Sequence, residues 1–274
     1  MSAQKKTYSD LKDFLRKNKT IPEKEFTHTS LGNVPHSYPG SYCIDDSELN
    51  LFYNLYKKHV FDENKAAHLT EKHKDCSQIL IDLDLRHNYN ADNKRKYNKQ
   101  FLKDFVKIYV ETLNSVITNI DKKYLKAYVL EKPKPRKSVQ GSKNILKDGI
   151  HIMFPYIISE PKLQYLIRYK VITNEKIKEL FEGIESVNSL EDIFDIAVIE
   201  RNNWQMYGSC KPNNSTYKLT HIIDYNDGDV KCLVNNHSDL DLIKILSIRN
   251  IKDKYKLNVS EYMSNIEEEF ESIP

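Results

Sequence analysis

The spacing of apolar residues along the chain predicts helices and strands in interleaved order. Apolar residues recur every three to four positions, the period of an amphipathic helix, in segments 8–18, 45–60, 94–117, 162–184 and 238–250. Short apolar runs rich in β-branched and aromatic residues predict strands at 78–86, 126–132, 148–157, 193–200, 204–211 and 217–225. Because no linker rich in Pro, Gly or Ser separates two halves, the pattern favours one α/β or α+β domain with two lobes.

The length and composition are typical of a soluble, globular protein. The 274 residues suffice for one large domain or two small ones, and 30% of them are charged. No run approaches the ~20 apolar residues of a membrane span, and the first residues lack the apolar core of a signal peptide. The four cysteines, at positions 43, 76, 210 and 232, form no C-x-x-C pair. We therefore expect reduced thiols in an intracellular protein.

Segment 132–147 concentrates positive charge in a chain whose net charge is only +3. We expect a loop between two strands, with six basic residues and no acid: Lys132, Lys134, Arg136, Lys137, Lys143 and Lys147. A basic loop beside carboxylates would suit a phosphate-bearing ligand together with a metal ion. The alternative is an ordinary solvated loop.

The tetrapeptide DLDL occurs twice, and its first copy predicts a metal site. Asp82 and Asp84 lie in the apolar run "QILIDLDLR", where alternation places both on one face of a buried strand. Two carboxylates there repel each other and lose hydration, which a divalent cation would offset. The alternative is that each carboxylate is satisfied by a basic side chain or a helix end.

The second copy predicts the start of a helix. Ser238 precedes it, Asp241 follows three positions later, and the apolar run "LIKIL" comes next. This is a capping box with Asp in place of Glu, and it needs no metal.

Three further segments supply candidate ligands. Asp195 lies inside the apolar run "IFDIAVIE" and is our third carboxylate, with Asp192 as its rival. In "KDGIHIMFP", Lys147, Gly149 and His151 share one strand face, where they would meet phosphates; the alternative is a core histidine. In "RNNWQMYGSCKP", the turn around Gly208 offers donors suited to a triphosphate, although it could be an ordinary turn; the donors are Arg201, Ser209 and Lys211. Together these residues predict metal-assisted phosphoryl or nucleotidyl transfer.

The order "ILIDLDLR … KDGIHIMFP … IFDIAVIERNNWQMYGSCKP" resembles the archaeo-eukaryotic primase superfamily, whose motifs are D-x-D/E, S-x-H and a hydrophobic residue followed by Asp. The closer resemblance is to the N-terminal primase domain of the poxvirus-type primase–helicases of large nucleocytoplasmic DNA viruses, through "FTHTS", "HLTEKH" and "LSIRN". The chain is also similar to the eukaryotic primase-polymerase. The resemblance implies an α+β fold, an RRM-like antiparallel sheet unit packed with a second α/β unit. It implies an N-terminal extension at 1–24, a catalytic domain at 25–250, and an acidic linker toward a helicase part at 251–274.

The resemblance also implies roles for single residues. Asp82, Asp84 and Asp195 would hold two Mg²⁺ or Mn²⁺ ions for template-directed synthesis by a DNA primase or primase-polymerase. The triphosphate of a dNTP or NTP would be bound by Lys147, His151, Ser209, Lys211 and Arg201. Two positions depart from the motifs: Gly149 replaces Ser, and Gln205 stands where the primase-polymerase has Arg.

The implied partners are single-stranded DNA template, primer and a helicase part, with no membrane. No G-x-x-x-x-G-K-[ST] motif occurs in the sequence given. The implied location is a cytoplasmic virus factory or the nucleus of an infected cell.

Three other functions remain open at this point. A manganese-dependent D-x-D glycosyltransferase has no need for Lys147, His151 and Lys211. A rolling-circle initiator nuclease needs two histidines flanking one hydrophobic residue, and "GIHIMF" supplies one. A non-catalytic single-stranded-DNA-binding domain would keep its DNA affinity without the three aspartates.

Overall fold

The computed structural model describes residues 8–21, 23–32, 34, 37–89, 92, 94–118, 120–252, 254–257, 262–271 and 273. The chain divides into two compact units. Unit 1 comprises Met1–His73, Asn203–Thr216 and His237–Asn250, and unit 2 comprises Lys74–Asn202, Tyr217–Asn236 and Ile251–Pro274. Each unit has a sheet of its own, and the predicted domain bounds remain a prediction.

Unit 1 is built on a five-stranded antiparallel sheet in the order β1-β3-β2-β4-β9. Its strands are β1 (Lys19–Thr20), β2 (His28–Ser30), β3 (Gly40–Tyr42), β4 (Leu69–Glu71) and β9 (Trp204–Gln205). Its helices are α1 (Leu11–Lys17), α2 (Leu49–Lys57) with the π-helical turn η1 (Lys58–Asp62), and α7 (Asp239–Leu246). Phe14, Phe52 and Tyr56 are fully buried in its core.

The segments "FTHTS", "HLTEKH" and "LSIRN" meet inside unit 1 at the buried carboxylate of Glu71. Ser247 Oγ donates to Glu71 Oε1 over 2.5 Å, and the Ile248 amide donates to Oε2 over 2.9 Å. The His28 ring nitrogen Nε2 lies 3.6 Å from Glu71 Oε1. Three segments far apart in sequence therefore meet at one buried carboxylate, which accepts hydrogen bonds from Ser247 and Ile248 and so has a structural role.

The second DLDL copy begins α7, as predicted. Ser238 is the N-cap, and the reciprocal bonds between Ser238 and Asp241 form a capping box. The hydrogen bond from Ser238 lowers the pKa of Asp241, so the helix terminus itself stabilises this carboxylate in its charged form.

Unit 2 is built on a seven-stranded sheet in which the long strand β8 is central. Strand β5 pairs with one edge of β8; on its other side lie β7, β6 and β12, and the path continues through β10 to β11. Its strands are β5 (Ser77–Asn88), β6 (Lys126–Glu131), β7 (Arg136–Gln140), β8 (Lys143–Ser159), β10 (Lys218–Asn226), β11 (Asp229–Leu233) and β12 (Tyr255–Lys256). All pairings are antiparallel except that of β12 with β8.

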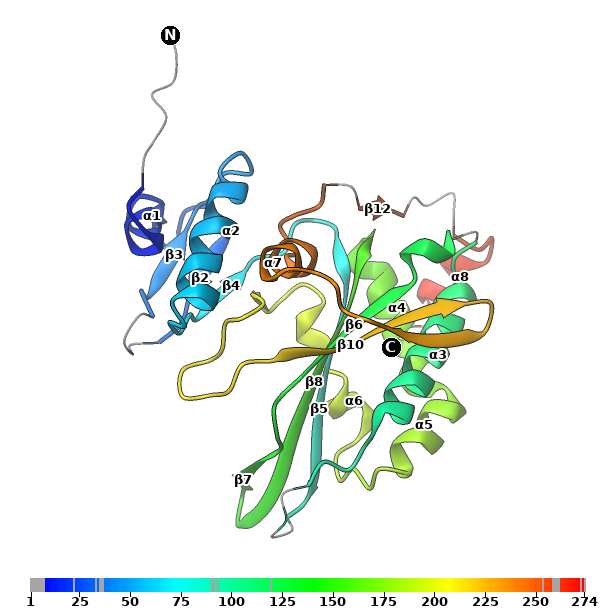
Figure 1. Ribbon diagram of the computed structural model, residues 1–274. Coiled ribbons are helices and arrows are strands. Elements are labelled where there is room, and N and C mark those ends of the chain that lie inside the picture. The colour runs from blue at the N-terminus through cyan, green and yellow to red at the C-terminus, as the bar shows by residue number, and fades with distance from the viewer. Residues whose placement is uncertain are drawn as a thin grey trace. The chain divides into compact units, whose positions relative to one another are not determined.

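Helices cover one face of the unit 2 sheet (Figure 1). They are α3 (Lys99–Asn114), α4 (Pro161–Thr173), α5 (Glu175–Glu182), α6 (Leu190–Ile193) and α8 (Ile266–Glu271), with the 3-10 turns η2 (Lys122–Tyr124) and η3 (Ile196–Val198). In β5, Ile79, Ile81, Leu83 and Leu85 point into the core beneath these helices. Because side chains alternate along a strand, Asp82 and Asp84 point to the opposite face.

The mixture of helices with antiparallel sheets confirms the predicted α+β class. Two local predictions differ from the structure. The basic segment 132–147 is not a loop throughout, because β7 and the start of β8 pair as a hairpin, with β5 running alongside β8 as far as Ile145 (Figure 1). Segment 193–200 is not a strand but a single β-bridge followed by η3. In the region 251–274, β12 pairs with β8, and Ile266 and Phe270 are buried in the core; the linker expected there stays a prediction.

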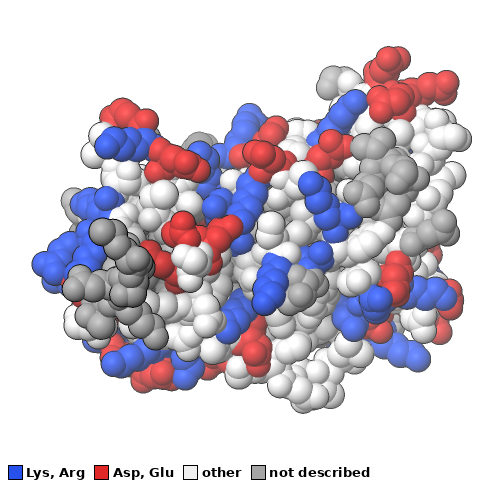
Figure 2. Space-filling view, turned by 90° about the horizontal axis from the view of Figure 1, so that it is seen from above, with Lys and Arg blue, Asp and Glu red and all other residues white. Residues whose placement is uncertain are grey.

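Among the described residues, none of the helices combines the length and apolar character needed to cross a bilayer. Lys and Arg side chains are interspersed with Asp and Glu over the face seen in Figure 2. On that face, the surface charge is therefore mixed rather than divided into regions of one sign.

Candidate active site on the carboxylate face of unit 2

The face of the unit 2 sheet opposite the helices carries both aspartates of the first DLDL copy, and we call it the carboxylate face. The register of β5 on β8 places Asp82 opposite His151, and Asp84 opposite Gly149. Directly opposed residues point to the same side of a sheet. The D-x-D pair and the histidine of the predicted site therefore lie side by side, on the sheet face that the sequence predicted.

Asp195 joins this row from the free edge of β5. Leu83 and Phe194 form an antiparallel bridge, and the Asp195 amide donates to the Asp82 carbonyl over 3.0 Å. This register places Asp195 opposite Asp82, on the side of β5 that faces away from β8. The row across the sheet is Asp195, Asp82, His151.

An arginine from α4 holds the segment before Asp195 in place. Arg168 Nε donates to the Phe194 carbonyl and Nη2 to the Glu191 carbonyl, each over 2.9 Å. Burial lowers the pKa of Arg168. Asp192, the rival candidate, lies in α6 and does not take part in this bridge.

One carboxylate oxygen of Asp82 is buried and accepts no hydrogen bond from the described residues. This oxygen, Oδ1, lies 3.6 Å from His151 Nε2. Asp82 and Asp195 also line a small cavity of about 20 Å³, but its other lining residues include Ile81, Tyr109 and Phe194 of the helix-covered core, so this cavity does not lie on the carboxylate face. An unsatisfied buried carboxylate oxygen is costly, so this position is suited to a cation.

Within the described ranges, no group of three or more His, Cys, Asp or Glu side chains is gathered to hold a metal ion. Asp195 Oδ1 accepts a hydrogen bond from the Ala197 amide over 2.9 Å and so caps η3, while Asp84 is exposed. The backbone register aligns the three aspartates, but their oxygens do not converge on one point.

Tyr217 covers the middle of the carboxylate face, and the sequence did not single it out. Its ring stacks on the His151 ring with 3.6 Å between centroids, and Lys132 Nζ lies 3.9 Å from the centre of the Tyr217 ring. Burial raises the pKa of Tyr217, and the negative charges of Asp82 and Asp84 raise it further. The tyrosine hydroxyl therefore stays protonated.

Comparison with known proteins identifies the family of this chain. Residues 27–223 match the family model described as "C962R protein N-terminal AEP domain", an archaeo-eukaryotic primase family. The chain belongs to this family. The predicted membership of the archaeo-eukaryotic primase superfamily is thereby confirmed, and at the level of the family the chain is a primase-like nucleotidyltransferase domain.

A viral relative matches most of this primase-family domain. The protein named "Putative helicase" of Acanthamoeba polyphaga mimivirus is 33% identical over 201 residues, which are 71% of this chain and 19% of that protein. The chain thus spans about a fifth of the length of the curated relative that it matches.

The structure explains why this primase-family domain has glycine where the motif has serine. A Cβ atom on Gly149 would lie 2.4 Å from the Tyr217 hydroxyl oxygen, far inside van der Waals contact. The Tyr217 hydroxyl thus fills the space that a serine side chain would need.

We expect Gly149→Ala to lower the free energy of unfolding by about 1–3 kcal/mol, the usual cost of overpacking. The added methyl group must displace the Tyr217 ring from His151. In a Tyr217→Ala background, the same change should cost little. Urea denaturation of the four proteins in a double-mutant cycle measures this coupling. An equal cost in both backgrounds would show that Tyr217 does not fill this space.

The remaining predicted contacts of this primase-family domain lie in different places. Lys147 is on the carboxylate face of β8, opposite Arg86 of β5. Arg201 follows η3 in unit 2 and is exposed. Ser209 and Lys211 belong to unit 1, where Lys211 is exposed.

Ser209 requires a correction. It is fully buried in unit 1, where its hydroxyl accepts a hydrogen bond from the Leu69 amide and shares another with the Tyr56 hydroxyl. Both hydrogen bonds fix the turn after β9 within unit 1. The Ser209 side chain therefore has a structural role, and we withdraw it as a triphosphate contact.

Two residues near the carboxylates were missed by the sequence prediction, for different reasons. Arg86 continues the alternation of Asp82 and Asp84 at the next outward position, so the pattern itself could have indicated it. Tyr217 lies 66 positions after His151, and no local signal connects the two residues.

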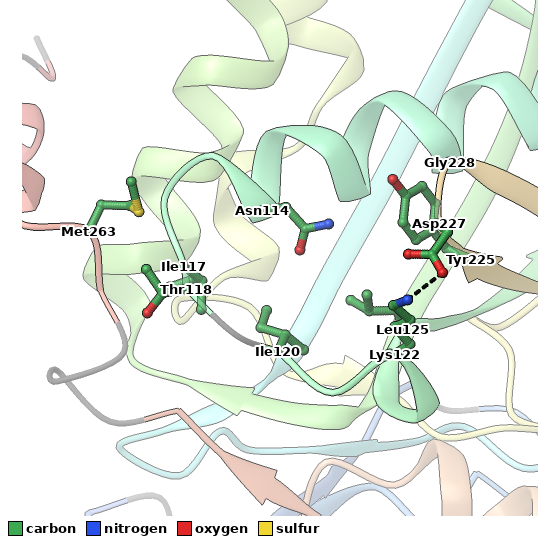
Figure 3. Close-up of a pocket in the computed structure, with 10 residues that line it drawn as sticks. All are labelled: Asn114, Ile117, Thr118, Ile120, Lys122, Leu125, Tyr225, Asp227, Gly228 and Met263. Atoms are coloured by element: carbon green, nitrogen blue, oxygen red, sulfur yellow. Dashed lines mark hydrogen bonds and ion pairs between the residues drawn. The ribbon is translucent and has the colours of Figure 1, made fainter.

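The wider pocket of about 560 Å³ shown in Figure 3 is not the predicted site. It lies between the end of α3, the segment around η2 and the β10–β11 turn, and Lys122 forms an ion pair with Asp227 at its edge. None of the predicted site residues lines it; the lining residues are Asn114, Ile117, Thr118, Ile120, Lys122, Leu125, Tyr225, Asp227, Gly228 and Met263.

Proposed function

We propose that this domain is a DNA-template-directed nucleotidyltransferase, a DNA primase or primase-polymerase, that synthesises primers for viral-type DNA replication. The observation that supports it most is the row of Asp195, Asp82 and His151 across three adjacent backbone segments. Membership of an archaeo-eukaryotic primase family supports the same reaction class.

Asp82, Asp84 and Asp195 would hold two Mg²⁺ or Mn²⁺ ions. The fit rests on two observations. Asp82 Oδ1 is buried without a hydrogen-bond partner among the described residues, and the hydrogen bond from the Ala197 amide to Asp195 uses Oδ1. Hard divalent cations prefer carboxylate oxygens. When bound, such ions would activate the attacking 3′-hydroxyl and stabilise the leaving pyrophosphate.

The chain's own donors would bind and orient the triphosphate. His151 lies beside Asp82, and Lys147 lies further along the same face of β8. An imidazole N–H and an ammonium group placed beside the carboxylates would neutralise phosphate oxygens and orient the nucleotide. Lys211 and Arg201 remain candidates for the same task.

The partners follow from the proposed reaction and from the relative. Single-stranded DNA would be the template, with a primer and nucleoside triphosphates as substrates. The mimivirus relative is named as a helicase and is about five times as long as the matched region. We therefore propose a helicase part as the partner of this domain in replication, in an infected cell.

The test is incubation with single-stranded DNA, Mn²⁺ or Mg²⁺ and labelled nucleotides, without a primer. We expect labelled oligonucleotides that depend on template and metal. A parallel reaction supplies a primer and distinguishes extension from chain initiation. Absence of product in both reactions would contradict the proposal, as would consumption of UDP-sugar in place of nucleotides.

A further inference from the structure

A row of three cations crosses the carboxylate face next to the aspartates. Lys147 of β8 is opposite Arg86 of β5 on one side and opposite Arg136 of β7 on the other. Because opposed residues share a face, the three cations point to the same side as Asp82, Asp84 and His151. We call these three residues the cation row.

The cation row forms no direct ion pair within the described part of the chain. Among the described residues, no ion pair or hydrogen bond involves the side chain of Arg86, Lys147 or Arg136. The Arg86 Nε is a buried donor without a hydrogen-bond partner. Three adjacent like charges on neighbouring strands repel one another, and a buried unpaired donor adds to this cost. A bound anion would offset both.

Arg95, on the helix-covered face, differs from the three cations because it is paired with carboxylates, and this difference supports an anion site at the cation row. Arg95 pairs with Asp148 over 2.8 Å and with Glu131 over 2.6 Å. Asp148 is the immediate neighbour of Lys147 on β8. The same stretch of sheet therefore pairs its carboxylates with the arginine on one face, whereas the cations on the other face form no ion pair among the described residues.

The position relative to the carboxylates limits the size of the ligand. Two residues along a strand span about 7 Å, so Arg86 lies about 7 Å from Asp84 and about 13 Å from Asp82. Neighbouring strands lie about 4.8 Å apart, so the row is about 10 Å wide. Long side chains on such a row can reach a chain of phosphates that begins at Asp82 and Asp84.

We propose that Arg86 and Arg136, together with Lys147, form a phosphate-binding site for a ligand held at the carboxylates. Arginine binds phosphate with two parallel hydrogen bonds, and lysine adds a compact positive charge. This inference deepens the proposed function by assigning the phosphates of its substrates to the cation row. The phosphates belong either to a nucleoside triphosphate or to the backbone of a DNA strand.

The experiment replaces one charge at a time, with Arg86→Gln and Arg136→Gln. The control is Lys137→Gln, which removes the same charge from the neighbouring position of β7. Lys137 is opposite the buried Leu146 and points to the other face of the hairpin. Binding is measured in Mg²⁺ with three probes: inorganic tripolyphosphate, dATP and a 15-nucleotide oligodeoxythymidine.

We expect each Arg→Gln change to weaken binding of at least one kind of probe by about tenfold, the effect of losing one charge-assisted hydrogen bond. Weaker tripolyphosphate and dATP binding assigns the row to the nucleotide. Weaker oligonucleotide binding, with a salt dependence lower by about 0.7 per lost contact, assigns it to the strand. Lys137→Gln should bind all three probes as the unchanged protein does.

The inference is overturned if both arginine variants, with unchanged thermal unfolding, bind all three probes as tightly as Lys137→Gln does. Arg136→Glu provides a second variant on an exposed position of the hairpin, where the fold should tolerate the change. Because binding is measured without turnover, the outcome is independent of primer synthesis. If the unchanged domain makes no primers while the arginine variants still lose phosphate binding, that result would contradict the proposed function and support the phosphate-binding role of the cation row.

Discussion

Asp82→Ala is expected to abolish nucleotidyl transfer without unfolding the domain. Asp82 is the centre of the row, with Asp195 on one side and His151 on the other, and its Oδ1 is buried without a hydrogen-bond partner among the described residues. Residues that only support metal ligands are worth about 10–100-fold, so loss of a ligand itself should cost at least about a hundredfold. Primer synthesis on single-stranded DNA with Mn²⁺ measures the loss, and circular dichroism measures the fold.

The second DLDL copy supplies a matched control. Asp241→Ala also removes an aspartate from a DLDL tetrapeptide, but this aspartate belongs to the capping box of α7. We expect it to lower stability modestly, through loss of the reciprocal cap, and to leave primer synthesis unchanged. Retained activity in Asp82→Ala would refute the assignment of the carboxylate face, and lost activity in a folded Asp241→Ala would refute the distinction between the two copies.

Arg95→Ala is expected to destabilise unit 2 by about 3–5 kcal/mol, because removing one partner of a buried ion pair leaves an uncompensated charge. Arg95 donates to Asp148 and Glu131, whose side chains are 1% and 4% exposed. Burial raises the pKa of Asp148, and the Arg95 hydrogen bond opposes that rise. Without the guanidinium, Asp148 would be left buried without its ion-pair partner, and Glu131 would keep only its hydrogen bonds from Tyr97 and Thr220 and the nearby His221 ring. Urea denaturation followed by circular dichroism measures the change.

The neighbouring Lys96 is the control for Arg95. Its ion pair with Glu185 is exposed, with Glu185 77% accessible, so Lys96→Ala should change stability by at most about 1 kcal/mol. Equal effects of the two substitutions would contradict the buried network. Arg95 also donates to the Lys132 carbonyl over 2.6 Å, so its loss should also loosen the chain that leads into the hairpin.

Much of the local structure in both units could be predicted from the sequence, because the relevant signals are local. Period-two alternation in β5 separates Ile79, Leu83 and the other core residues from Asp82 and Asp84. The capping signal around Ser238 distinguishes two identical tetrapeptides. In both cases neighbouring residues determine the outcome, since strand faces and helix caps are decided within a few positions.

The prediction was wrong where the backbone met a distant partner. The apolar residues around Asp195 indicate a strand, yet only one bridge forms, because the segment covers the free edge of β5 and then turns into η3. The basic segment 132–147 has the composition of a loop, yet its residues pair across β7 and β8. Ser209 is suited to phosphate binding by its type and neighbours, yet burial commits its hydroxyl to unit 1.

The sequence by itself determined which residues share a face and which helix needs a cap, since alternation and capping act over a few residues. Only the tertiary structure decided what lies beside each of them. The register of β8 with β5 and β7 brings Arg86, Lys147 and Arg136 into one row, and the chain's return at Tyr217 fills the space above Gly149. The strand register and the position of Tyr217 are set by packing between segments that lie tens of residues apart in the sequence. A short stretch of sequence therefore cannot predict them.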